Sequence, residues 1–203
     1  MKIAVIGAGA IGCLVAGYLK NTGEDVSLVG HADAVSAISQ KGLFVSGARG
    51  DFNIKIPSFE VLQDKPELAI LAVKTQDLEE ALRANLKFLD SAIILTAQNG
   101  VRADIIASQL LAKKNIVSSI VMFGATYLEP GKVVHNFDRS WVIGRPEGSN
   151  DEKVLIVRDI LTKAFYIVIT EDMRGMKYLK VFVNSNNMAN YSIISILCKS
   201  LIA

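Results

Sequence analysis

The sequence is poor in the residues that disulfide-rich and metal-binding proteins use most. Its 203 residues include two cysteines and two histidines. Cys13 and Cys198 lie too far apart to resemble the dense disulfide framework of a small secreted domain, so we expect reduced thiols in a cytoplasmic protein. The His, Cys, Asp and Glu residues show no metal-ligand spacing, and we therefore predict no metal site.

An excess of charge and a long apolar run are lacking as well. The net charge is +2 without a long basic or acidic run, so the sequence indicates neither nucleic acid nor a membrane surface as a partner. No uncharged apolar stretch reaches the roughly 18 residues of a membrane span. The N-terminal apolar run follows a single lysine, as in a signal peptide, but its glycine spacing fits a strand and a tight turn better. Hydrophobic residues make up 51% of the chain, which is enough for a sizeable core.

Short apolar runs alternate with helical patterns over the first 122 residues. The runs predict strands at 2–6, 25–29, 68–73, 92–96 and 116–122, with weaker candidates at 43–46 and 52–56. The helical patterns cover 11–21, 34–41, 77–89 and 103–112. This alternation favours an α/β fold of the Rossmann-like, doubly wound kind, with a mainly parallel sheet covered on both faces.

The pattern changes after residue 122. Residues 123–145 predict antiparallel strands joined by a Pro-Gly turn. We place His135 on the surface of this hairpin and expect Trp141 to pack in the core or at an interface. A helix at 152–165, a strand at 166–170 and a long helix from residue 172 follow. We expect a dinucleotide-binding domain at 1–170 and the first long helix of an incomplete all-helical domain at 171–203.

Glycines at 7, 9 and 12 form a G-x-G-x-x-G pattern between a predicted strand and a predicted helix. This context makes an otherwise weak motif specific for dinucleotide binding. Gly7 permits the tight turn, Gly9 lets the backbone approach a pyrophosphate, and Gly12 lets helix and strand pack closely. The first helical residues, Ala10 and Ile11, offer free N–H groups to the phosphates.

The residues after the second strand bear on the choice of dinucleotide. An acidic residue at this point accepts hydrogen bonds from the ribose 2′-OH of NAD. The sequence instead has Gly30 and His31, with Asp33 two residues further on. Because His31 can donate to a 2′-phosphate, we favour NADP(H), although an exposed loop histidine without a ligand is an equally good interpretation of His31 alone.

Polar residues follow two other predicted strands. Lys74 comes after the strand at 68–73, and Gln98 and Asn99 come after the strand at 92–96. The carboxyl ends of parallel strands meet at one edge of the sheet, where ligands bind. We therefore expect Lys74 and Asn99 to lie near the cofactor.

The last helix combines apolar residues with a polar stripe. Lys180, Asn184 and Asn187 lie four and three residues apart, so they share one face of a helix. Buried amides and ammonium groups need polar partners. From the residues alone, a hydrogen-bond network between helices and a cleft for a polar substrate explain this stripe equally well.

Together these segments resemble the ketopantoate reductase (2-dehydropantoate 2-reductase) family, over essentially the whole chain. The resemblance is carried by "KIAVIGAGAIGCL", "LAVKTQD", "LTAQNGV", "FGATYLEPGKVVH", "VIG" and "KYLKVFVNSNN". It implies NADPH-dependent reduction of 2-dehydropantoate, a 2-oxo acid, on the route to pantothenate and coenzyme A. It also implies that Lys180 donates the proton, that Asn99, Asn184 and Asn187 bind substrate, and that Lys74 and Asn99 lie beside the cofactor.

Two departures from the family pattern leave alternatives open. Met188, not Asn187, occupies the eighth position after Lys180, and His31 stands where many members have arginine. The family also continues for roughly another hundred residues, whereas this chain stops in an apolar segment that favours a partner surface, such as a homodimer through the C-terminal helix. A related β-hydroxyacid dehydrogenase and a dinucleotide-binding fragment without catalysis are the alternative functions.

Overall fold

A computed structural model describes residues 1–185 of the chain. The main sheet has eight strands in the order β12-β11-β8-β7-β6-β1-β2-β5. In chain order these strands are β1 (Lys2–Ile6), β2 (Asp25–Val29), β5 (Ser58–Phe59), β6 (Leu68–Leu71), β7 (Ile93–Thr96), β8 (Ile116–Val121), β11 (Trp141–Gly144) and β12 (Ile167–Ile169). Neighbouring strands are parallel except that β11 is antiparallel to β8. The expected mainly parallel α/β sheet is confirmed.

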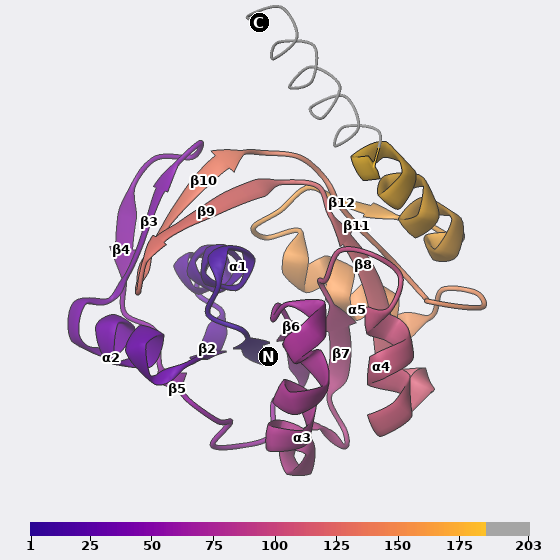
Figure 1. Ribbon diagram of the computed structural model, residues 1–203, viewed down its shortest axis with the longest axis horizontal. Helices are drawn as coiled ribbons and strands as arrows, with labels where there is room; N and C mark the ends of the chain where they lie inside the picture. The colour runs from indigo at the N-terminus through magenta and orange to yellow at the C-terminus, as the bar shows by residue number, and fades with distance from the viewer. Residues whose placement is uncertain (186–203) are drawn as a thin grey trace, which may run out of the picture.

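The helices connect these strands and cover the sheet. They are α1 (Ala10–Asn21), α2 (Ala32–Lys41), α3 (Leu78–Leu89), α4 (Ala103–Leu110) and α5 (Glu152–Leu161), with short 3-10 turns η1 (Thr75–Asp77) and η2 (Lys113–Asn115). Residues 173–185 are also helical and form the gold segment of Figure 1. Within residues 1–185, no helix combines the length and the apolar character needed to cross a membrane.

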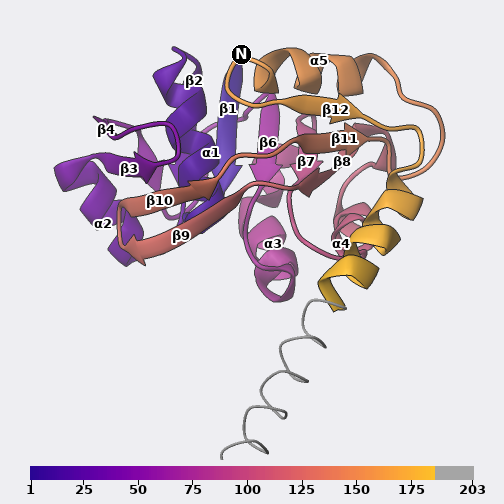
Figure 2. The same ribbon diagram turned by 90° about the horizontal axis from the view of Figure 1, so that it is seen from above.

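A second sheet was not predicted. It has the order β4-β3-β10-β9 and consists of β3 (Leu43–Gly47), β4 (Phe52–Ile54), β9 (Gly124–Glu129) and β10 (Lys132–Phe137). The β9–β10 hairpin with its Pro-Gly turn was expected, but the parallel pairing of β3 with β10, nearly ninety residues apart, was not. In Figure 1 this sheet arches over α1, which lies between it and the main sheet. Figure 2 shows the same layers from above.

The two faces of the main sheet have separate cores. Along β1, Ala4 and Ile6 pack with α3 and α4, whereas Ile3 and Val5 pack with α1, α5 and the second sheet. Successive residues of a strand point to opposite faces, so a fully apolar β1 serves both cores. The continuous apolar runs of the sequence are explained by this double burial.

His135 corrects one expectation. We placed it on the surface of the hairpin, but it is 1% exposed, between β10 and α1. Tyr18 Oη lies 2.9 Å from His135 Nδ1, and burial lowers the pKa of the imidazole. The error arose because the side of the hairpin that faces α1 cannot be identified before the second sheet is known. Trp141 is fully buried as expected, and its Nε1 donates to Ser119 Oγ at 2.7 Å.

Candidate functional site at the carboxyl edge of the sheet

The glycine loop follows β1 at the centre of the main sheet. Gly7 has φ of 120°, which favours glycine, and its N–H donates to the Val29 carbonyl at 2.8 Å. A Cβ at this position would lie 2.5 Å from the backbone nitrogen of Val73. Gly12 is equally constrained, because its Cβ would lie 1.7 Å from the carbonyl oxygen of Gly7. Gly12 is therefore required by the backbone of the turn itself, and Gly7 by its own positive φ and by the neighbouring backbone after β6.

Gly9 differs from its neighbours in the loop. It is exposed, and a Cβ added there would meet no atom within 4 Å. Since the fold leaves this space open, the backbone at Gly9 can approach a ligand closely. Helix α1 begins at Ala10, has no acidic residue in its first turn, and presents the N–H groups of Ala10 and Ile11 at its positive end. This loop fits the pyrophosphate of a dinucleotide.

His31 and Asp33 lie at the start of α2, beside the end of β2. His31 is the N-cap residue and Asp33 lies in the first turn, and both side chains are exposed. A carboxylate and an imidazole are thus both available next to the place where a ribose would lie.

Gln98 connects the ends of β6 and β7 by hydrogen bonds. Its Nε2 donates to the carbonyls of Leu71 at 2.9 Å and Val73 at 3.1 Å. Lys74 follows at the start of η1 with an exposed side chain. The predicted convergence of polar residues from two strands is thus present, with Gln98 fixing the loop that carries Asn99.

Lys180 brings the C-terminal helix to the same edge. Its Nζ donates to Asn99 Oδ1 at 2.7 Å and to the carbonyl of Val121 at the end of β8. Burial, and to a smaller extent the charge of Lys177, lowers the pKa of Lys180. Lys180 and Asn99, 81 residues apart in sequence, therefore form one cluster.

The remainder of the polar stripe is less enclosed. Asn184 is exposed, one helical turn beyond Lys180. Asn187, Cys198 and the apolar end of the chain lie outside the described residues. Leu179 and Phe182 are 56% and 64% exposed, and the helix contacts the sheet edge through its Lys177 and Lys180 side.

An ion pair next to this cluster was not predicted from the sequence. Lys177 Nζ donates to Asp104 Oδ2 at 2.6 Å, and Asp104 also accepts hydrogen bonds from Thr96 and Ser118. Lys177 is three residues before Lys180 and so shares its side of the helix, a spacing that could have indicated a role. Nothing local marks Asp104 as its partner.

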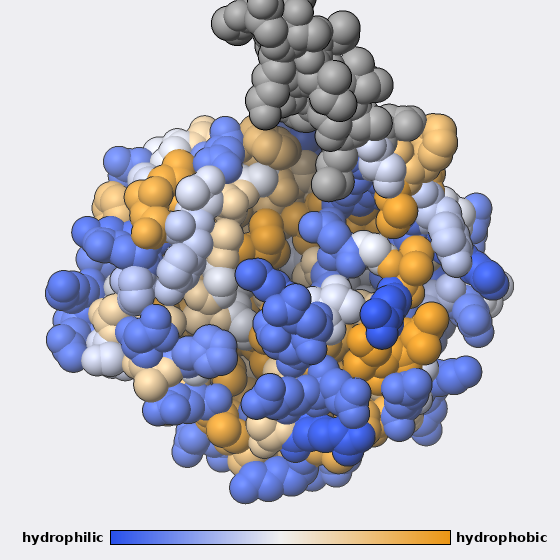
Figure 3. Space-filling view, viewed as in Figure 1, coloured by the Kyte–Doolittle hydropathy of each residue, from blue (hydrophilic) through white to orange (hydrophobic). Residues whose placement is uncertain are grey.

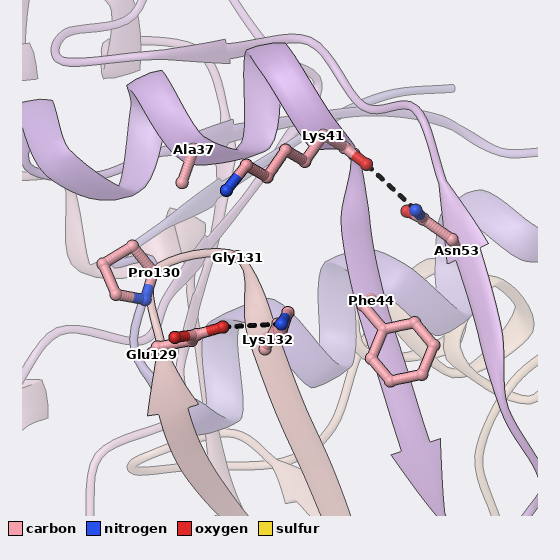
Figure 4. Close-up of a pocket in the computed structure, with 9 residues that line it drawn as sticks. Ala37, Lys41, Phe44, Asn53, Glu129, Pro130, Gly131 and Lys132 are labelled. Atoms are coloured by element: carbon pink, nitrogen blue, oxygen red, sulfur yellow. Dashed lines mark hydrogen bonds and ion pairs between the residues drawn. The ribbon is translucent and has the colours of Figure 1, made fainter.

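A separate cavity lies away from this cluster. It measures about 460 Å³ and is bordered by the end of α2, by β3 and β4, and by the β9–β10 turn, as Figure 4 shows. Lys41, Phe44 and Lys132 line it, and it shares no residue with the carboxyl-edge cluster. A smaller hollow of about 200 Å³ is lined by Asp104 and Lys177.

On the face shown in Figure 3, hydrophobic residues gather in a hollow near the centre, within a largely hydrophilic rim.

Comparison with known proteins agrees with this geometry. Residues 3–148 match the family model "Ketopantoate reductase PanE/ApbA". The 2-dehydropantoate 2-reductase of Pyrococcus horikoshii is 34% identical over 190 residues, which cover 91% of this chain and 61% of the relative. A crystal structure of a PanE/ApbA family ketopantoate reductase from Ralstonia eutropha is 26% identical, with a TM-score of 0.81, and covers 91% of this chain and 61% of that one.

A ternary structure of D-mandelate dehydrogenase with NADH and anilino(oxo)acetate is also similar. It is 26% identical with a TM-score of 0.83, over 91% of this chain and 61% of that one. The chain thus spans about 61% of the length of its relatives. The family model covers most of the sequence, including the glycine loop and Asn99. This chain belongs to the ketopantoate reductase family.

Proposed function

We propose that the protein reduces 2-dehydropantoate to pantoate with NADPH, a step of pantothenate and coenzyme A biosynthesis. The contact of Lys180 Nζ with Asn99 Oδ1, at the sheet edge that carries the glycine loop, is the observation on which this proposal rests. It joins a cation and an amide at the place where a dinucleotide and a small polar substrate would meet. The curated relatives named 2-dehydropantoate 2-reductase support the choice of substrate.

When bound, NADPH supplies a hydride to the carbonyl carbon of the substrate. The electron pair of the C=O bond then moves onto the oxygen, which needs a proton. The Lys180 ammonium stabilises this negative charge and gives up one proton, leaving a hydroxyl group and a neutral amine that solvent reprotonates. Because burial already lowers the pKa of Lys180, its proton is released more readily than that of an exposed lysine.

The amides orient the substrate without adding charge. Asn99 is held by its contact with Lys180 and by the neighbouring Gln98, whereas Asn184 lies one turn further along the helix. We assign Asn99 and Asn184 to the carboxylate and hydroxyl groups of the substrate, with Asn187 as a further candidate. Lys74, exposed on the same edge, is assigned to the cofactor.

For the cofactor we propose NADP(H) over NAD(H). His31 lies at the end of β2 and can donate a hydrogen bond to a 2′-phosphate. Asp33, two residues later, would repel that phosphate if it turned toward it. Binding of NADPH and NADH to the wild type, His31→Ala and Asp33→Ala tests this choice: a preference for NADPH that is lost in His31→Ala is expected, and an unchanged preference contradicts it.

A second candidate is reduction of a different 2-oxo acid with NADH. The resemblance to a D-mandelate dehydrogenase solved with NADH and anilino(oxo)acetate favours it. The sequence points to an alternative of the same kind, a related β-hydroxyacid dehydrogenase that acts on another acid. A dinucleotide-binding fragment without catalysis is the third, since the chain spans about 61% of its relatives' length.

Turnover assays separate these candidates. NADPH and NADH oxidation is followed by absorbance with 2-dehydropantoate and with aromatic 2-oxo acids, on the wild type and on Lys180→Ala. Turnover of 2-dehydropantoate with NADPH that disappears in Lys180→Ala is the expected result. Turnover of an aromatic 2-oxo acid alone favours the second candidate, and NADPH binding without turnover of any 2-oxo acid favours the third.

A further inference from the structure

A buried ion pair lies one helical turn before Lys180. Lys177 and Asp104, joined at 2.6 Å, have side chains that are 5% and 14% exposed. The pair connects the helix at 173–185 with the first turn of α4, elements that are 73 residues apart in sequence. Buried charges are tolerated only when they are paired and hydrogen-bonded, so breaking one partner of such a pair has a large effect.

The carboxylate of Asp104 is fixed by the main sheet. Thr96 Oγ1 donates to Asp104 Oδ1 at 2.6 Å, and Ser118 Oγ donates to Asp104 Oδ2 at 2.7 Å. Thr96 ends β7 and Ser118 belongs to β8, and both residues are fully buried. The acceptor for Lys177 is therefore attached to the two strands whose ends contact Lys180.

Lys180 receives its own contacts from the same two strands. Asn99 follows β7, and Val121 ends β8. Lys177 and Lys180, three residues apart, share one side of their helix. Two anchoring points on one helical side, one charged and one at the proposed reaction centre, fix both the rotation and the height of the helix above the sheet edge.

The charged groups around Lys180 in the described chain are few. Its own helix contributes Lys177, α4 contributes Asp104, which is paired with Lys177, and β7 and β8 present the neutral oxygens of Asn99 and Val121. Burial is the larger cause of the lowered pKa of Lys180, and the charge of Lys177 is the smaller one. The charge of Lys177 therefore influences the protonation of Lys180.

We propose that the Asp104–Lys177 ion pair is a positioning clamp, which holds the Lys180 ammonium against Asn99 and Val121 at the carboxyl edge of the sheet. Asp104 and Lys177 are positioning residues and act through Lys180. The catalytic consequence rests on the proposed function, whereas the position and protonation of Lys180 can be measured without any turnover.

The test is the pH titration of Lys180 in the whole chain. Trace acetylation across a pH series, quantified by mass spectrometry of the Lys180 peptide, gives its pKa in the wild type, Lys177→Gln, Asp104→Asn and Lys177→Arg. We expect the pKa of Lys180 to rise toward the usual lysine value of about 10.4 in Lys177→Gln, because a neighbouring positive charge and the anchor are both lost. Lys177→Arg keeps the charge and the ion pair and should restore the wild-type titration.

Asp104→Asn tests the anchor while the charge of Lys177 remains. Backbone hydrogen exchange of residues 173–185 should become faster in Asp104→Asn and Lys177→Gln, with cofactor binding as the check that the remainder of the fold is intact. Lys163→Gln is the matched control, because Lys163 forms an ion pair with Glu24 far from this edge. An identical Lys180 titration and identical exchange in the wild type, Asp104→Asn and Lys177→Gln would overturn the clamp.

Turnover with NADPH and 2-dehydropantoate is measured in parallel. If the wild type is active, both clamp variants should lose at least tenfold in kcat while NADPH affinity is retained, and unchanged kcat contradicts a catalytic role of the clamp. If the wild type is inactive while the titration of Lys180 shifts as expected, the proposed function fails for this chain and the clamp stands.

Discussion

The glycine loop and the C-terminal helix meet at one sheet edge but are built in opposite ways. The loop depends largely on backbone geometry within residues 7–12, where Gly7 has a positive φ and a Cβ on Gly12 would meet the Gly7 carbonyl oxygen. The helix at 173–185 depends on side-chain contacts with partners 59 to 81 residues away. The proposed cofactor site is therefore a local motif, whereas the position of the proposed proton donor is a property of the whole domain.

The largest expected effect concerns the glycine loop. Gly12→Ala places a methyl group 1.7 Å from the Gly7 carbonyl, so the turn must open. We expect a loss of stability of about 3 kcal/mol and no measurable cofactor binding. Thermal unfolding and NADPH binding measure both.

Gly9→Ala is the matched control for the loop. Its Cβ enters open space at φ of −86°, which alanine adopts freely, so stability should stay within about 0.5 kcal/mol of the wild type. NADPH binding should nevertheless weaken, because the methyl group occupies the space left for the ligand. Equal behaviour of the two alanine variants would contradict the assignment of separate roles to Gly9 and Gly12.

Lys180→Met tests the contribution of the C-terminal helix to the site at this sheet edge. Removing the ammonium should lower kcat by about a hundredfold to ten-thousandfold, the usual contribution of a general acid, while NADPH affinity stays unchanged. Steady-state kinetics give kcat, and binding measurements give the NADPH affinity. Lys163→Met, at a remote ion pair, is the control that should keep wild-type kcat.

A pH series extends the comparison without a mutation. Lys180 must be protonated to donate, and its pKa is lowered, so kcat should fall on the alkaline side at a lower pH than an ordinary lysine would give. NADPH binding should change less than turnover over that same range, since the backbone N–H groups that the glycine loop offers to the pyrophosphate do not titrate. If NADPH binding and turnover were lost in parallel, the glycine loop and the Lys180 helix would not act independently.

The smallest expected effect concerns His135, beneath the second sheet. Its pKa is lowered by burial, so the unfolded chain binds a proton more readily than the folded chain. Stability should be complete above pH 6.5 and decrease as the pH falls toward the folded pKa, by about 1.4 kcal/mol for each pKa unit between the two states.

Denaturant unfolding of the wild type and His135→Gln between pH 5 and 8 measures this dependence. The variant should show a flatter slope, since glutamine does not titrate. A slope equal to that of the wild type would assign the pH dependence to other groups. The series also provides the stability baseline for turnover measured at low pH.

Much of the main sheet could be predicted because its signals are local. The strands at 2–6 and 25–29 were predicted with the bounds that the structure has. The apolar run at 68–73 marked the strand but not its end at Leu71, because Ala72 and Val73 continue the hydrophobic pattern into the loop. The two-residue strand β5 was missed, since so short an edge strand has no periodicity to detect.

The sequence by itself determined the glycine loop, the alternation of strands and helices, and the candidates Lys74, Asn99 and Lys180, because backbone sterics and hydrophobic periodicity act between near neighbours. Only the tertiary structure decided that β3 pairs with β10, that His135 is buried, and that Asp104 receives Lys177. These contacts join segments that are 73 or more residues apart or depend on such a pairing. Their partners are selected by which surfaces meet when the two sheets and the C-terminal helix pack together, and no local pattern encodes that choice.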